Sequence, residues 1–289
     1  MFPGQFEYHR ADSVKNALAL MKQFGDEAKL LSGGHSLLPM MKLRLAQPAH
    51  LIDIGRIGEL RAISEQGGKV VIGAACTHDE ISRNEIVRGK VGLFADCAAA
   101  IADVQVRNRG TIGGSLSHAD PGADYPAGAL ALEAELRLES EAGSRMVKAE
   151  DFFVDIMTTT ARADEILTQA VFAPIPAGAG YIYIKHRQPA SGFAMVGVAA
   201  LTTLDRRGNF DRVRVGITGL AAKAFRAKAV ESALAGKAPD MGVIASAAGH
   251  AADGVEPLSD IHASADFRAE LARVYAARAL AAAASRVKK

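Results

Sequence analysis

Ser32-Gly33-Gly34-His35-Ser36 is the stretch that decides the fold, and Thr111-Ile112-Gly113-Gly114-Ser115 repeats its pattern further along the chain. Each glycine pair follows an apolar segment and is bracketed by hydroxyl residues. Because glycine has no Cβ, consecutive backbone N–H groups can turn toward one bound anion. Two such loops predict a grip on the two phosphates of a dinucleotide, through charge-assisted hydrogen bonds worth roughly 1.5–3 kcal/mol each. For either loop alone, a purely structural turn is the alternative.

Further side chains near these loops have chemistry that suits a nucleotide cofactor. His35 is a candidate phosphate ligand, or a loop imidazole bonded to nearby backbone. Asp120 and Asp124 follow the second loop, where a carboxylate accepts hydrogen bonds from ribose or ribityl hydroxyls; a helix cap is the alternative, and the one we prefer for Asp120. Lys185 ends an expected strand and is either a surface lysine or a cation at the edge of a cofactor ring. Phe193 either stacks on a flat ring or enters the core.

Common nucleotide-binding and catalytic motifs are absent from the sequence. It contains neither the Gly-x-Gly-x-x-Gly fingerprint nor the phosphate loop that ends in Gly-Lys-Ser or Gly-Lys-Thr. Ser36 and Ser115 lack the Gly-x-Ser-x-Gly elbow of a hydrolase nucleophile. His78 and His118 lack the i, i+4 spacing of a metal-binding pair. We therefore assign no catalytic residue and no metal ligand.

Composition narrows the class of protein. The 289 residues carry 34 Lys and Arg against 32 Asp and Glu, a balance that argues against a nucleic-acid partner. No apolar run predicts a transmembrane segment, and the opening residues lack the pattern of a secretory signal, so we expect a cytoplasmic protein. Cys76 and Cys97 are the only cysteines and cannot supply the four thiolates of an iron–sulfur cluster. We expect both in the core.

Apolar patterning predicts strands and helices in both halves of the chain, joined by a linker over residues 174–180. In the first half we expect strands at 6–9, 29–31, 51–54 and 166–172, hairpins over 60–75 and 135–148, and helices at 14–24, 37–45, 77–84, 91–102 and up to 132. In the second half we expect strands at 181–185, 194–204 and 213–220, then helices at 227–234, 241–250 and 267–287.

Several blocks in the same order and spacing make the chain resemble the flavin-binding medium subunit of the molybdenum hydroxylases, the carbon monoxide dehydrogenase and xanthine dehydrogenase family. The similarity covers essentially the whole chain. The blocks are Phe2-Pro3-Gly4 with Phe6-Glu7-Tyr8-His9-Arg10, Gly33-Gly34-His35-Ser36-Leu37-Leu38-Pro39, Thr111-Ile112-Gly113-Gly114, Asp120-Pro121-Gly122-Ala123-Asp124-Tyr125-Pro126 and Glu165-Ile166-Leu167.

The resemblance implies an α+β fold in two domains. The first, residues 1–176, is a FAD-binding domain of the vanillyl-alcohol-oxidase (PCMH) type with subdomains at about 1–56 and 57–176. The second, residues 177–289, is a carbon monoxide dehydrogenase flavoprotein C-terminal domain with a three-stranded antiparallel sheet and a helical bundle. FAD is expected between the two subdomains.

The resemblance also assigns cofactor-binding residues. They are Ser32, Gly33, Gly34, His35, Ser36, Ile101, Thr111, Ile112, Gly113, Gly114, Ser115, Asp124, Leu167, Lys185 and Phe193. The two glycine segments are expected to hold the pyrophosphate, with Asp124 near the ribityl chain and Phe193 bordering the isoalloxazine ring. Our hypothesis for Lys185 is that its charge favours an anionic reduced flavin.

The sequence departs from the family pattern in three places. Relatives usually carry Asn at the position of Ser115 and often a small residue such as Ala at that of Ser32; Ser115 can still donate a hydrogen bond. Some have Tyr at the position of Phe193, where Phe keeps the stacking surface and loses a hydroxyl. The cysteine-bearing insertion of 4-hydroxybenzoyl-CoA reductases is missing, which argues against that branch.

The expected function is that of an electron-transfer subunit. A large partner subunit would carry the molybdenum cofactor, and a small one the [2Fe–2S] clusters that deliver electrons to this FAD, as a dimer of heterotrimers. The flavin would then reduce an external acceptor. The alternatives are a stand-alone FAD-dependent oxidoreductase and a non-catalytic nucleotide-binding protein. Whether the holoenzyme oxidises carbon monoxide, a purine, an N-heterocycle or an aldehyde is left open, as is the acceptor.

Overall fold

Three short strands near the N-terminus form a parallel sheet. The computed structural model, which describes residues 2–288, orders them β1 (Glu7–Arg10), β3 (His50–Asp53) and β2 (Ala28–Leu31). Parallel strands need a crossover connection, and helix α1 (Val14–Phe24) supplies the one between β1 and β2, which lie on either side of β3. It begins where the Ser13 side chain accepts a hydrogen bond from the Asn16 amide, and its bounds are those that the sequence predicts.

A five-stranded antiparallel sheet forms the middle of the molecule. Its order is β4 (Ile63–Gln66), β5 (Lys69–Gly73), β10 (Ile166–Phe172), β6 (Glu135–Ser140) and β7 (Gly143–Lys148). The β4–β5 hairpin turns on Gly67 and Gly68, with φ of +56° and +76°. Glycine adopts two such values in succession without strain, so the local sequence favours this turn.

Short helices connect the strands of the first two sheets. They are α2 (Leu37–Lys42), α3 (His78–Arg83), α4 (Glu85–Lys90), α5 (Gly92–Ala100), α6 (Val104–Arg107), α7 (Ile112–His118), α8 (Asp124–Ala131) and α9 (Ala149–Phe152). The remaining short elements are η1 (Gly25–Glu27), η2 (Gly58–Leu60), β8 (Phe153–Asp155) and β9 (Thr158–Thr159). α8 is buried along its whole length.

One expectation for this region was wrong. The second glycine pair does not form an open loop, because Gly113 and Gly114 lie inside α7. Thr111 begins this helix by accepting a hydrogen bond from the Gly114 amide at 3.2 Å. A Cβ at Gly113 would lie 2.6 Å from that of Ala74, so glycine serves close packing here.

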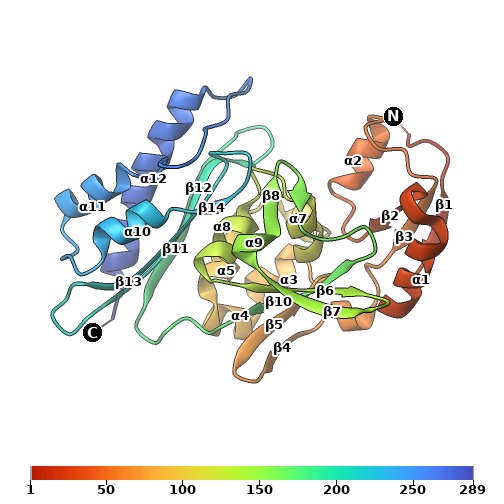
Figure 1. The fold of residues 1–289 in the computed structure, drawn as a ribbon, viewed down its shortest axis with the longest axis horizontal. Coiled ribbons are helices and arrows are strands. Elements are labelled where there is room, and N and C mark those ends of the chain that lie inside the picture. Colours follow the sequence, from red (N-terminus) through yellow and green to blue (C-terminus); the bar gives the residue numbers. More distant parts are fainter. Residues whose placement is uncertain (1, 289) are drawn as a thin grey trace.

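The C-terminal part is an antiparallel sheet with helices on one face (Figure 1). Three long strands, β11 (Gly180–Arg187), β12 (Ala194–Leu204) and β13 (Phe210–Thr218), are joined by the two-residue β14 (Phe225–Arg226). Helices α10 (Lys228–Leu234), α11 (Met241–Ala248) and α12 (Ala265–Ser285) cover one face, and α8 packs on the other. The expected α+β class is confirmed. Over residues 2–288, no helix combines the length and apolar character needed to cross a bilayer.

Candidate functional site

The first glycine segment leaves the end of β2 with its backbone donors free. No N–H group of residues 33–36 donates a hydrogen bond to another described residue. Gly34 has φ of +76°, which turns successive amides toward one side. The segment therefore has the unsatisfied donors that an anionic group requires.

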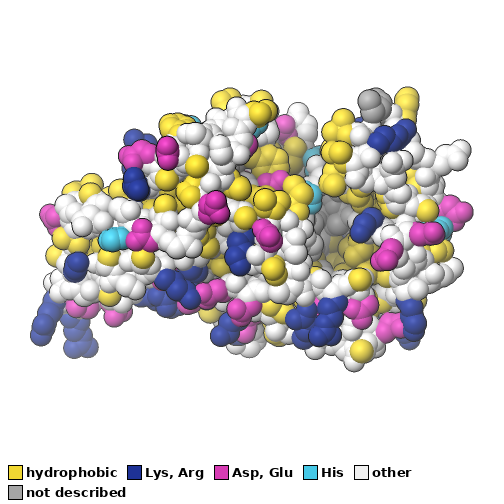
Figure 2. All heavy atoms as spheres, turned by 45° about the horizontal axis from the view of Figure 1, so that its top comes forward, with side chains coloured by type: hydrophobic (Ala, Val, Ile, Leu, Met, Phe, Trp, Pro, Cys, Tyr) yellow, Lys and Arg dark blue, Asp and Glu magenta, His cyan; other side chains and the backbone are white. Residues whose placement is uncertain are grey.

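The two glycine segments meet in space, as the sequence predicts. The Ser32 and Thr111 hydroxyl oxygens are 3.0 Å apart. A Cβ at Gly33 would clash with the Arg109 carbonyl and lie 2.7 Å from the Gly110 Cα, so only glycine permits this approach. Figure 2 shows the surface hollowed between the N-terminal part on the right and the middle of the molecule, with histidine side chains at the edge of the hollow.

The second segment contributes differently from the expectation. Its amides from Ile112 to Ser115 are already used within the fold; for example, Ile112 N donates to Cys76 O at 3.1 Å and Gly113 N to Ala74 O at 2.8 Å. What this segment presents is the Thr111 hydroxyl and the half-buried Ser115 side chain at the start of α7. Most of the free backbone donors of the two segments thus belong to residues 33–36.

Two histidines near this junction differ in environment. His35 is exposed, and its Nδ1 lies 3.1 Å from the Gly33 carbonyl oxygen. His78 is buried below the second segment, with its Nδ1 3.2 Å from the Tyr125 hydroxyl. Burial, together with the positive charges of His35 and Arg107, lowers the pKa of His78 to about 3. His78 is therefore a neutral core residue.

Asp124, the first residue of α8, is held in a buried ion pair with Lys185 of β11. Its carboxylate accepts a hydrogen bond from the Tyr183 hydroxyl at 2.6 Å and lies 2.8 Å from Lys185 Nζ. The two charged side chains are 4% and 5% exposed. Burial raises the pKa of the Asp124 carboxyl, and Lys185 and Tyr183 oppose part of the rise. Because the pair neutralises itself, Lys185 does not present an isolated positive charge.

The loop after β11 brings the remaining predicted residues together. Lys185 Nζ also donates to the Gly192 carbonyl at 2.6 Å, which fixes the loop that ends at Phe193. Phe193 is 45% exposed, so much of its ring is free to contact a ligand. A Cβ at Gly192 would lie 3.2 Å from the Cα of Ala102, so this loop abuts the turn that includes Ile101.

Leu167 stands apart from these contacts. It is buried in β10 beside a register shift and belongs to the same hydrophobic core cluster as Ile112 and Leu116. Cys76 and Cys97 are buried and unpaired, which confirms the expectation that they belong to the core.

Sequence reasoning missed two residues that shape the site. Tyr183 fixes the Asp124 carboxylate, and Arg107 holds the turn after α5 by donating to the carbonyls of Ile101 and Ala102 at 2.8 and 3.1 Å. Tyr183 lies two residues before Lys185 on a strand, a spacing that puts both side chains on one face. Arg107 carries no comparable local signal.

Free backbone donors, paired hydroxyls, a buried charge pair and an exposed aromatic ring are the contacts that a flavin dinucleotide needs, and the residues present fit such a group. Residues 4–176 match the FAD binding domain in molybdopterin dehydrogenase, and residues 181–283 match the CO dehydrogenase flavoprotein C-terminal domain. The fold and site thus define a FAD-binding oxidoreductase component. More particularly, the chain belongs to the family of medium, FAD-binding subunits of carbon monoxide dehydrogenase and xanthine dehydrogenase type, which confirms the resemblance.

Individual relatives match over their full length. The chain is 42% identical over 287 residues to the carbon monoxide dehydrogenase medium chain of Hydrogenophaga pseudoflava, covering 99% of each. It is 36% identical over 280 residues to the glyceraldehyde dehydrogenase medium chain of Sulfolobus acidocaldarius, covering 96% of this chain and 98% of the other. A solved structure of the Hydrogenophaga pseudoflava carbon monoxide dehydrogenase superposes with a TM-score of 0.96 at 43% identity, covering 100% of both chains.

Proposed function

We propose that this chain is the FAD-binding electron-transfer subunit of a heteromeric molybdenum hydroxylase. In this function it accepts electrons from [2Fe–2S] clusters of a partner subunit and passes them to an external acceptor. The observation that carries the proposal is the junction of the two glycine segments, where four amides are free and the Ser32 and Thr111 hydroxyls lie 3.0 Å apart. Full-length similarity to named medium subunits supports it.

The chain's own residues would bind and orient the cofactor. The amides of residues 33–36 and the hydroxyls of Ser32, Thr111 and Ser115 would hold the diphosphate, with His35 at the rim. The bound FAD supplies the redox chemistry. The other residues that we propose to contact FAD lie outside the two glycine segments. They are Ile101, Asp124, Leu167, Lys185 and Phe193.

Lys185 would act on the ring as one half of an ion pair. Asp124 offsets its charge at 2.8 Å, so the net field at the ring is weaker than that of an isolated cation. Our hypothesis that Lys185 favours an anionic reduced flavin therefore predicts a modest effect. A Lys185→Ala variant whose flavin midpoint potential equals that of the parent would remove its support.

We also propose the division into domains 1–176 and 177–289, with subdomains at about 1–56 and 57–176. The partners would be a large subunit with the molybdenum cofactor and a small [2Fe–2S] subunit, in a dimer of heterotrimers. A cytoplasmic location is favoured by two buried cysteines without a disulfide. The relatives' names differ between carbon monoxide and glyceraldehyde, so the substrate of the holoenzyme stays open.

Purification from the native host tests the proposal. We expect the chain to co-purify with two partners in a complex that contains FAD, molybdenum and iron, and reduction by the holoenzyme's substrate should bleach its flavin absorption. Turnover of a small substrate by the isolated chain would favour a stand-alone flavoenzyme instead. A purified chain that stays colourless after FAD is added would point to a non-catalytic nucleotide-binding protein.

A further inference from the structure

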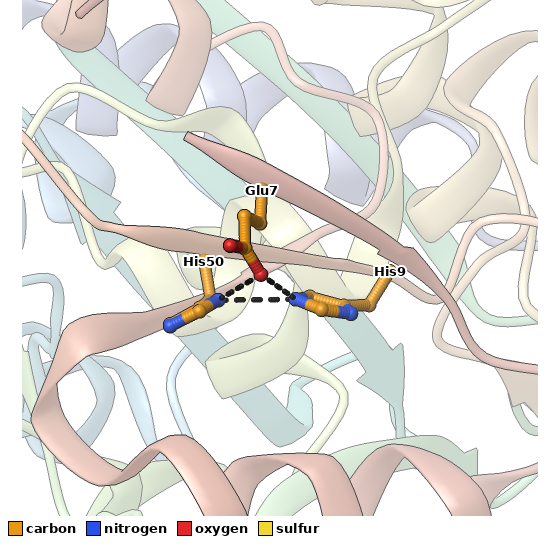
Figure 3. A group of neighbouring side chains, drawn as sticks. All are labelled: Glu7, His9 and His50. Atoms are coloured by element: carbon orange, nitrogen blue, oxygen red, sulfur yellow. Dashed lines mark hydrogen bonds and ion pairs between the residues drawn. The ribbon is translucent and has the colours of Figure 1, made fainter. Parts of the chain in front are cut away.

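Three side chains on the N-terminal sheet converge on one point (Figure 3). His9 Nε2 lies 3.0 Å from His50 Nδ1, and the Glu7 carboxylate oxygen Oε2 lies 3.8 Å from the former and 3.5 Å from the latter. All three potential ligand atoms fall within 4.8 Å of one another. In the described residues 2–288, no other group of three His, Cys, Asp or Glu side chains is arranged in this way.

The parallel sheet creates this arrangement. Glu7 and His9 are two residues apart on β1, so their side chains share a face. Glu7 is the register partner of His50 on β3. The Phe24 ring, from the end of α1, stacks on the rings of His9 and His50 at centroid distances of 4.6 and 3.9 Å and holds both imidazoles in place.

The donor spacing matches a metal coordination sphere. Ligands about 2.0–2.1 Å from a tetrahedral zinc ion lie about 3.4 Å from one another. The observed separations of 3.0, 3.5 and 3.8 Å bracket that value. Without a metal, one of the two facing ring nitrogens must carry a proton and donate it in a hydrogen bond to the other. If neither nitrogen carried a proton, their two lone pairs would repel each other.

We propose that Glu7, His9 and His50 bind a divalent transition metal of the zinc type. Two imidazoles and one carboxylate supply three ligands, and water takes the fourth position, which the exposed Glu7 leaves open to solvent. Imidazole and carboxylate together favour zinc or a neighbouring first-row ion over calcium or magnesium, which prefer oxygen alone.

The site has a structural purpose distinct from the cofactor. Glu7 and His50 are the first residues of their strands, whereas Ser32 follows the last residue of β2 and leads into Gly33. Because the three strands are parallel, strand starts and strand ends lie at opposite ends of the sheet. The metal would therefore join β1 to β3 at the end of the sheet away from the first glycine segment. No described residue accepts a hydrogen bond from the other ring nitrogens, His9 Nδ1 and His50 Nε2. Supporting bonds of that kind typically strengthen metal affinity about 10- to 100-fold, so we expect modest affinity.

Metal titration of the full, tag-free chain tests this site. We expect one Zn²⁺ per chain by calorimetry, and with Co²⁺ the visible absorption of a tetrahedral nitrogen–oxygen site. His9→Ala and His50→Ala should each weaken Zn²⁺ binding by more than about tenfold and abolish the Co²⁺ absorption. Glu7→Gln should weaken binding less and must fold normally, because the Glu7 side chain is 73% exposed.

The matched control is His262→Ala, which removes an exposed histidine outside the cluster. It should bind Zn²⁺ as the parent does, and FAD binding should be unchanged in Glu7→Gln and His9→Ala. A parent chain that gives no tetrahedral Co²⁺ spectrum overturns the proposal. So does an unchanged Zn²⁺ affinity in His9→Ala and Glu7→Gln, which decide the matter even if His50→Ala does not fold.

Discussion

Replacing Gly33 with alanine tests the junction on which the proposed function depends. The added Cβ would lie 2.7 Å from the Gly110 Cα and closer still to the Arg109 carbonyl oxygen. That is about 1 Å inside the separation at which carbon atoms normally pack. Both neighbours are backbone atoms, so the strain cannot be relieved by a side-chain rotation, and the two glycine segments must move apart.

The magnitude follows from the cost of overpacking. An extra methyl group in a close contact costs about 1–3 kcal/mol. If the segments part to relieve the clash, FAD binding has to bring them together again, and the same free energy is lost from affinity. Since 1.4 kcal/mol is a factor of ten, the FAD dissociation constant should rise about 5- to 150-fold.

Calorimetric titration of the apo chain with FAD measures the effect. Gly58→Ala is the matched control, because its Cβ would meet no atom within 4 Å and its φ is not positive. It should bind FAD as the parent does. If Gly33→Ala binds FAD as tightly as Gly58→Ala, the two segments do not close on a common ligand and the reasoning fails.

Three further changes test other parts of the site. Lys185→Met should lower the free energy of unfolding by about 3–5 kcal/mol at neutral pH by stranding the buried Asp124 charge, as urea titration would measure. Burial raises the folded-state pKa of Asp124, so this deficit should shrink as the pH falls and the carboxyl binds a proton; a pH-independent deficit would contradict it. Ser32→Ala should lower the unfolding free energy by about 0.5–1.5 kcal/mol through its lost contact with Thr111, and no change would mean that this bond does not form. In the folded protein the pKa of His78 is lowered from 6.5 to about 3, so the parent should lose stability as the pH falls from 6.5 toward 3. In His78→Gln, the urea midpoint of unfolding should depend less on pH over this range.

Elements with strong local signals were predictable from the sequence. The Ser13 cap and Gly25 stop define α1, and Gly67-Gly68 fixes the β4–β5 hairpin. The prediction of an open loop at the second glycine pair was wrong, because glycine is a weak helix former and tertiary contacts override that preference in α7. Its packing against Ala74 has no trace in the local sequence.

Some residues of the candidate site could likewise be predicted from local sequence, and others could not. Residues 32–36 and 111–115 are recognisable as motifs in the sequence. Their meeting in space was predicted because both were expected to bind one dinucleotide. The partners of Asp124 lie 59 and 61 positions away, so their identity requires the register of β11. The cluster of Glu7, His9 and His50 likewise needs the pairing of β1 with β3, which composition and spacing do not reveal.

The close packing of α8 against the C-terminal sheet limits where two related chains can be joined to make a chimera. Gly216 lets the strand approach the Ala127 carbonyl so closely that a methyl group would not fit, and Gly219 N donates to Pro121 O at 2.7 Å. A chimera that takes its C-terminal half from a relative would import a foreign surface against this helix and separate Asp124 from its own Lys185. Hybrid flavoproteins should therefore tolerate a crossover ahead of residue 120, so that the helix and its sheet are inherited from one parent, better than a crossover at the linker.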